Sequence, residues 1–352
     1  MNKHLPAALQ SSSTWRLAQE HLAPLLALWP GTALAGVLAL AATFVSRLHG
    51  GPQLLYALFF GVAFHFLTQD GRVKKGVDFC ARGVLRLGVG LLGARITVEQ
   101  IAGLGWSTAL IVVVAVLSTL ACGRWLGQRL GLSPSQGILS GGAVAICGAS
   151  ATLAISAVLP RDKDSDRFTL MVVVTVTVLS TVAMVIYPLL ARALHLPPEL
   201  AGLFLGGTIH DVAQVVGAGY TIDQATGDYA TIVKLFRVSM LALVVVGVSF
   251  AFRRQRGDQA SADAARQPLV PWFLWLFVAL VALHSGGWMA PTLQLGLVEV
   301  SRHCLVLAIA ALGMKTSFGQ LAQAGWRPFL LLLLETLWMA ALVLVCILLF
   351  KA

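Results

Sequence analysis

The sequence predicts an all-α polytopic membrane protein with about eleven transmembrane helices, inverted-topology repeats and broken helices. Three observations support this class: the composition, a series of long apolar segments, and an internal repeat. Of the 352 residues, 58% are hydrophobic and 11% are charged, and the mean hydropathy is +0.83. Because soluble domains carry about 25% charged residues, this composition excludes a water-soluble fold.

Eleven apolar segments approach the roughly 20 residues that a helix needs to cross a bilayer. They are 31–48, 53–69, 77–94, 107–126, 134–159, 168–190, 199–219, 230–252, 271–288, 297–314 and 327–350. We expect residues 1–30 to form an N-terminal cytoplasmic tail and residues 31–352 to form a single transmembrane domain.

The basic loops predict the orientation of the chain. Two loops carry three cations each, Arg72, Lys74 and Lys75 in one and Arg253, Arg254 and Arg256 in the other. Six predicted spans separate these loops, so both lie on the same side, which the positive-inside rule makes cytoplasmic. The N-terminus is then cytoplasmic, and the loop 161–167 is expected outside. The net charge of +10 therefore fits membrane topology, and no nucleic-acid partner is expected.

An internal repeat predicts the architecture. Residues 82–106 align without gaps on residues 302–326, with nine identities in 25 positions, among them Arg82 with Arg302. Arg95 and Lys315 form a conservative pair. The alignment pairs the third span with the tenth, so the two copies cross the membrane in opposite directions, as in many secondary transporters. We predict repeat one at about 31–160 and repeat two at about 229–352.

The fifth predicted span is rich in glycine and small polar residues. Gly141, Gly142 and Gly148 lie near its centre, which favours a broken helix between Ala143 and Thr152. The second half-helix would then begin in mid-membrane, where its free N–H groups and positive dipole end favour an anion. The predicted substrate-binding residues here are Gly148, Ala149, Ser150 and Thr152. Alternatively, the glycines only permit close helix packing.

Charged residues inside other spans supply further candidates. His210 and Asp211 fall near the middle of the seventh span, where ionisable groups usually serve function, so we predict that this pair couples transport to protons. Lys234, Arg237 and Lys315 are predicted to bind the anion. The alternatives are that Asp211 only pairs with a basic residue, and that the cations reach the interface or end a helix.

The sequence predicts neither a cofactor nor a catalytic or metal site. The five cysteines lie singly, without a CxxC motif or a grouping with histidines. No nucleotide-binding loop, HExxH or GxSxG motif is present. We therefore do not expect an enzyme.

Four motifs resemble the YeiH-type family of bacterial inner-membrane proteins, which are described as sulfate exporters. They are the stretches 141–151, 210–219, 233–238 and 311–316, which read GGAVAICGASA, HDVAQVVGAG, VKLFRV and ALGMKT. The resemblance covers nearly the whole chain. It implies a multi-pass bacterial inner-membrane protein with inverted repeats and a sulfur-containing anion as substrate.

Together, the residues and the resemblance predict a secondary transporter of a small inorganic or organic anion, such as sulfate, sulfite or a sulfonate, with protons or sodium as coupling ion. The alternative is a cation/proton antiporter in which Asp211 binds the cation. An intramembrane enzyme or a sensor subunit would need a catalytic constellation or a signalling domain, neither of which the sequence shows. A homodimer is left open.

Overall fold

The computed structural model describes residues 13–50, 52–160, 165–252, 271–316 and 326–350, and in these ranges it contains helices and no strands. Six helical stretches are long and apolar enough to cross a membrane. They lie in α2 (Ser13–His49), α7 (Gly105–Arg129), α10 (Ser165–Ala193), the stretch Gln224–Ala251 formed by α13 (Gln224–Ser239) and α14 (Leu241–Ala251), α17 (Pro291–Lys315) and α19 (Trp326–Phe350). The predicted class, an all-α membrane protein, is confirmed.

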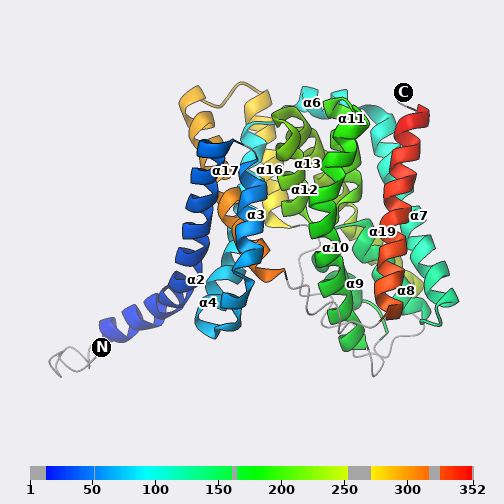
Figure 1. The fold of residues 1–352 in the computed structure, drawn as a ribbon, viewed down its shortest axis with the longest axis horizontal. Coiled ribbons are helices and arrows are strands. Elements are labelled where there is room, and N and C mark those ends of the chain that lie inside the picture. Colours follow the sequence, from blue (N-terminus) through cyan, green and yellow to red (C-terminus); the bar gives the residue numbers. More distant parts are fainter. Residues whose placement is uncertain (1–12, 51, 161–164, 253–270, 317–325, 351–352) are drawn as a thin grey trace.

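Shorter helices complete the bundle. α3 (Gln53–Ala63) and α16 (Trp272–Ser285) are apolar, and a composite stretch joins α4 (Gly71–Phe79), a π-turn (Cys80–Val84), α5 (Leu85–Leu91) and a 3-10 turn (Leu92–Ala94). The short helix α6 (Val98–Gly103) lies at the end of the molecule opposite to α4 (Figure 1). We call these two ends the α4 face and the α6 face.

Two of the predicted spans are helical hairpins that enter and leave at the same face. α8 (Pro134–Ala145) and α9 (Ala149–Ser156) lie side by side near the α4 face (Figure 1), and a side chain at Gly142 would collide with Ile155. α11 (Pro198–Thr208) starts shortly after α10 ends, and α12 (Val212–Ile222) returns to that same end. There, Arg192 near the end of α10 donates to the carbonyl of Thr221 over 2.6 Å.

The hairpins correct the predicted topology. Segments 134–159 and 199–219 do not cross the bundle, because the chain reverses direction at the turn after Ala145 and again after Thr208. The start of α10 therefore lies at the α4 face with Lys75, so the prediction that residues 165–167 lie on the opposite side is wrong, whereas residues 161–164 of that loop lie outside the described residues. The two corrections cancel for the termini, since α2 starts at the α4 face and α19 ends at the α6 face (Figure 1). Residues 253–256 lie outside the described residues, and the cytoplasmic assignment stays a prediction.

The two repeat copies have matching elements that run in opposite directions. The starts of α3, α4 and α7, at 53, 71 and 105, recur as the starts of α16, α17 and α19 at 272, 291 and 326. The composite stretch from α4 rises towards the α6 face, whereas α17 descends towards the α4 face (Figure 1). The boundaries predicted for the whole repeats, 31–160 and 229–352, stay predictions.

A repeated glycine explains how the copies interlock. Gly93 packs against the backbone of Phe277 in α16, and its mate Gly313 packs against the backbone of Leu58 in α3. Each copy thus contributes its first helix to the other copy, and a Cβ at either glycine would collide with that helix. The two hairpins lie between these interlocked copies in the sequence.

Candidate functional site

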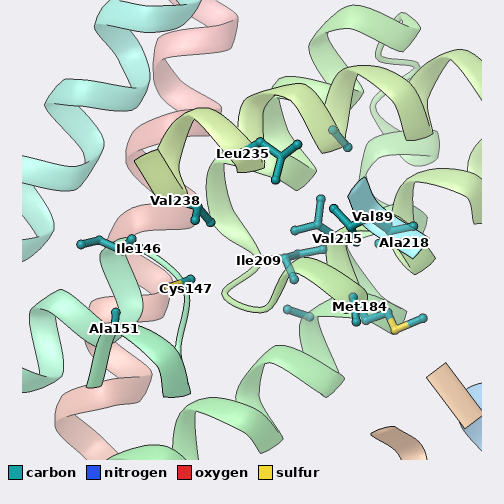
Figure 2. Packing of buried hydrophobic residues seen from close by; sticks show 14 of the residues in the cluster. Val89, Ile146, Cys147, Ala151, Met184, Ile209, Val215, Ala218, Leu235 and Val238 are labelled. Atoms are coloured by element: carbon teal, nitrogen blue, oxygen red, sulfur yellow. The ribbon is translucent and has the colours of Figure 1, made fainter. Parts of the chain in front are cut away.

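The tips of the two hairpins meet inside the bundle. α8 ends at Ala145, Ile146 leaves helical geometry with φ −115° and ψ −84°, and Gly148 reaches φ +62° before α9 begins. The predicted break between Ala143 and Thr152 is therefore present. A Cβ at Gly148 would lie 3.6 Å from Cβ of His210, so the first tip touches the second. Figure 2 shows the turn with Ile146 and Cys147 near the turn with Ile209, and the Ile146 side chain is directed away from Ile209.

Two fully buried cations bind the carbonyl ends of the half-helices α8 and α11. Lys234 Nζ donates to the carbonyls of Ile146 over 2.5 Å and Ile209 over 3.0 Å. Arg237 donates from Nε, Nη1 and Nη2, at 2.8 to 3.0 Å. Its acceptors are the carbonyls of Val144, Ala145, Gly206 and Ile209.

This arrangement gives Lys234 and Arg237 a supporting role. A helix end concentrates partial negative charge on its free carbonyls, and these two cations neutralise both ends at once. All five guanidinium N–H groups of Arg237 have carbonyl acceptors, and neither side chain lines the cavity described next. In this geometry Arg237 has no free N–H donor for an anion. The prediction that Lys234 and Arg237 contact the anion directly therefore stays a prediction.

The start of α9 faces a cavity of about 280 Å³ on the other side of the tips. We call it the α4 cavity. The residues that matter for its chemistry are Arg82, Arg86, Ala149, Ser150, Asp211 and Lys315. Three cations from the composite stretch and the end of α17 therefore share one space with a helix N-terminus and one carboxylate. Such a space is suited to a small anion.

The cations of the α4 cavity differ in how they are held. Lys315 Nζ lies 2.6 Å from a carboxylate oxygen of Asp78. Arg82 and Arg86 are exposed and form no ion pair with any residue that the structure describes. Their guanidinium groups are thus available to a ligand, and the spacing of four residues turns both towards the same side of the helix.

Asp211 lines the cavity at the N-cap of α12. Its Oδ1 accepts from the backbone N–H of Ala213 over 2.8 Å. The backbone N–H groups of His210 and Asp211 both donate to Ser180 Oγ of α10, over 3.2 and 3.1 Å. Asp211 is therefore fixed at the tip of the second hairpin with its carboxylate beside the cavity.

His210 does not line the α4 cavity. It is fully buried, with Nδ1 3.2 Å from the carbonyl of Val144 and Nε2 3.0 Å from Thr336 Oγ1. A carbonyl only accepts, so Nδ1 carries a proton. In the neutral ring the Thr336 hydroxyl donates to Nε2, whereas a doubly protonated ring would leave that hydroxyl to donate to Leu332, 2.7 Å away.

The structure thus groups part of the predicted site. Ala149, Ser150, Asp211 and Lys315 line the α4 cavity together, and Gly148 precedes them as the N-cap of α9. Thr152 is fully buried and donates to the carbonyl of Gly148, 2.9 Å away.

Two features of the site are missing from the predicted set. Arg82 and Arg86 complete the positive charge, and Gln214 is buried beside the second tip, where its Oε1 has no hydrogen-bond partner among the described residues. The i, i+4 spacing of the arginines was the available signal for the first feature. The sequence holds no comparable signal for Gln214.

The fold and the site define a polytopic membrane protein in which two opposed hairpins meet at a positively charged cavity. The chain belongs to the family described as Conserved hypothetical protein 698, which it matches over residues 30–332. This confirms the YeiH-type resemblance.

Relatives cover nearly the whole chain. A UPF0324 membrane protein of Chlorobaculum tepidum is 47% identical over 90% of this chain and 88% of its own length. One from Rhizobium meliloti is 44% identical over 95% of this chain and 96% of its own length. The UPF0324 membrane protein TauZ of Paracoccus pantotrophus is 47% identical over 90% and 93%, respectively.

Proposed function

We propose that this protein is a secondary transporter of a small anion, and that the α4 cavity is its binding site in the conformation described. One observation carries the proposal: the N-terminus of α9 opens into the same cavity as Arg82, Arg86 and Lys315. Backbone N–H groups at a helix start and guanidinium groups both bind tetrahedral oxyanions. Sulfate, sulfite and sulfonates are the proposed substrate class.

The hairpins supply what this site needs in a membrane. A half-helix that starts in mid-bilayer presents its positive end to the substrate, while its partner half-helix leaves a negative end that must be neutralised. Lys234 and Arg237 neutralise the negative ends. The positive ends of α9 and α12 therefore remain to act on the cavity side.

Asp211 gives a route to proton coupling. An ionised carboxylate beside the cavity repels a bound anion, and a proton on Asp211 removes that repulsion. Anion binding should thus strengthen as the pH falls through the range in which Asp211 takes up its proton. We propose that His210 also takes part in proton coupling. A second proton on its ring would change its hydrogen bond with Thr336.

Thermal stabilisation of the purified protein tests the anion site. A ligand at about 100 times its Kd stabilises the folded state by about 2.7 kcal/mol. We expect sulfate, sulfite or a sulfonate to raise the Tm of the wild type, and Arg86→Gln to abolish that rise. Lys75→Gln is the matched control, because Lys75 is an exposed cation of the α4 face that does not line the cavity. Equal stabilisation of both variants would contradict the site.

A cation/proton antiporter is the second candidate, and Gln214 favours it. Gln214 Nε2 donates to Thr181 Oγ1 over 2.7 Å, and Thr181 lies 3.5 Å from Thr316 Oγ1. The unpartnered Gln214 Oε1 and these hydroxyls are oxygen ligands of the kind that hard cations use. If sodium chloride raises the Tm more than the potassium salt does, and Asp211→Asn removes the difference, this function replaces the first.

A further inference from the structure

A second cavity opens at the α6 face, on the other side of the bundle. It has a volume of about 300 Å³, and two arginines, Arg95 and Arg302, line it. It also contacts the far end of the second hairpin through Tyr220. We call it the α6 cavity. The anion site described above does not use any of these residues.

The internal repeat relates the two cavities. Five of the eleven residues that line the α6 cavity are repeat mates of residues that line the α4 cavity, at the offset of 220. The mates, α4 cavity first, are Arg82 with Arg302, Leu85 with Leu305, Arg86 with Val306, Leu312 with Leu92, and Lys315 with Arg95. Both copies contribute to both cavities, in exchanged roles.

The two cavities also hold their charges alike. Each has an exposed arginine, Arg82 in one and Arg302 in the other. Among the described residues, the polar partners of Arg302 are distant, with Glu299 at 3.7 Å and Gln53 at 3.3 Å. Each cavity also has one cation in a closer ion pair: Lys315 Nζ lies 2.6 Å from Asp78 Oδ1, and Arg95 Nη2 lies 3.2 Å from Asp228 Oδ2.

We propose that the α6 cavity is a second binding site for the same class of small anion, the counterpart of the α4 cavity for entry from the opposite side of the membrane. The proposal rests on the proposed function. It follows because alternating access exchanges the conformations of inverted repeats, so residues that form an anion site in one copy have mates that form one at the other face.

Of the two cavities, the α4 cavity reaches the hairpin tips and the α6 cavity does not. The α4 cavity reaches Ala149, Ser150 and Asp211 at the tips, whereas the α6 cavity meets the second hairpin at Tyr220, near its base. Beside that cavity, Asp228 of α13 accepts from Tyr220 Oη over 2.7 Å and pairs with Arg95, which also stacks over the Tyr220 ring. The α6 cavity therefore does not reach the tips, and this cluster lies where it meets the second hairpin.

Protection of engineered cysteines from N-ethylmaleimide tests the second site. In a background without the five native cysteines, Val174→Cys reports on the α4 cavity and Val298→Cys on the α6 cavity, because each residue lines its cavity. Sulfate, sulfite and methanesulfonate are the probes. An anion at about ten times its Kd should slow both reactions about tenfold, by mass action.

Charge variants separate direct protection from a conformational effect. Arg302→Gln should remove protection of the cysteine at 298 and keep it at 174, and Arg82→Gln should do the reverse. Arg302→Lys, which retains the charge, should keep protection at both positions. Each variant is compared at equal elution volume and Tm, so that loss of fold is recognised.

The outcomes distinguish the second anion site from the proposed anion-transport function on which it rests. Protection at 174 alone keeps the anion transporter and overturns the second site. Protection at 298 that Arg82→Gln removes, or that survives Arg302→Gln, also overturns the second site, because the effect then comes from elsewhere. Protection at neither position by any of the three anions overturns both proposals.

Discussion

Gly148 stands at the N-cap of α9 with φ +62° and ψ −122°, a conformation that residues with a side chain rarely adopt. Its N–H donates to the carbonyl of Ala143 over 2.8 Å, which closes the turn between the half-helices. The direction of the free N–H groups at the start of α9 therefore depends on this one glycine.

Gly148→Ala should lower the free energy of unfolding by about 1–3 kcal/mol, the cost of a sparsely populated backbone conformation. Gly247→Ala is the control, because Gly247 is helical and has open space around the position of a Cβ. Thermal unfolding in detergent measures both. If Gly148→Ala melts with the wild type, the turn does not need a glycine, and this part of the account is wrong.

Arg237→Met should destabilise the fold rather than weaken anion binding alone. It removes five hydrogen bonds to buried carbonyls at the tips, and each carbonyl left without a partner costs about 1–3 kcal/mol. We expect aggregation or a Tm far below that of Lys75→Gln, measured by size exclusion and thermal unfolding. A variant with wild-type Tm and no anion binding would instead restore Arg237 as a direct ligand.

Sequence patterns indicated which residue types lie at the hairpin tips, but they did not indicate which groups these residues contact. Glycines indicated the break, which the structure contains. The mid-span position of Asp211 and the position of Lys234 inside an apolar span indicated functional roles, which stay predictions. Which carbonyls a buried cation contacts depends on the fold: Lys234 binds residues 25 and 88 positions away. The sequence could not supply this, because a cation that caps helix ends and one that binds a substrate look the same in an apolar segment.

The hairpins are the elements that hydropathy misread. Residues 134–159 and 199–219 have the length and composition of spans, but α8 and α9 are only 12 and 8 residues long and fold back on each other. Gly142 of α8 permits this fold-back, because a side chain there would collide with Ile155 of α9. Gly137 and Gly141 of α8 pack against the backbone of α7 around Gly123. A hydropathy window measures the length of an apolar segment and does not detect a reversal of chain direction within it.

Cysteine labelling in cells tests the reversal. In a background without native cysteines, Asp166→Cys and Lys75→Cys should share one accessibility to a membrane-impermeant maleimide, and Glu99→Cys of α6 should show the opposite one. All three positions are exposed, and the first two lie at the α4 face. Should Asp166→Cys react together with Glu99→Cys, residues 134–159 cross the membrane and the hairpin is wrong.

The whole molecule combines two interlocked copies with a central pair of opposed hairpins. The copies were predictable, because their identities survive at a constant offset and the matching elements begin within one residue of it. The convergence of the hairpins on one positive cavity was not, since it joins residues of α5, α9, α12 and α17 that share no local pattern. The proposed transport requires these parts to move relative to each other. Such a motion would exchange the roles of the repeat mates that line the α4 cavity and the α6 cavity.

Anion flux into proteoliposomes, measured with the probe that gives the largest stabilisation and with an imposed pH gradient, tests the central claim. The wild type should exceed protein-free liposomes, and Arg86→Gln should lose the flux while Lys75→Gln keeps it. Asp211→Asn should still bind the anion but lose about a tenfold pH dependence, equivalent to ~1.4 kcal/mol of repulsion. Sodium flux that Asp211→Asn abolishes, without anion flux above protein-free liposomes, would contradict the account.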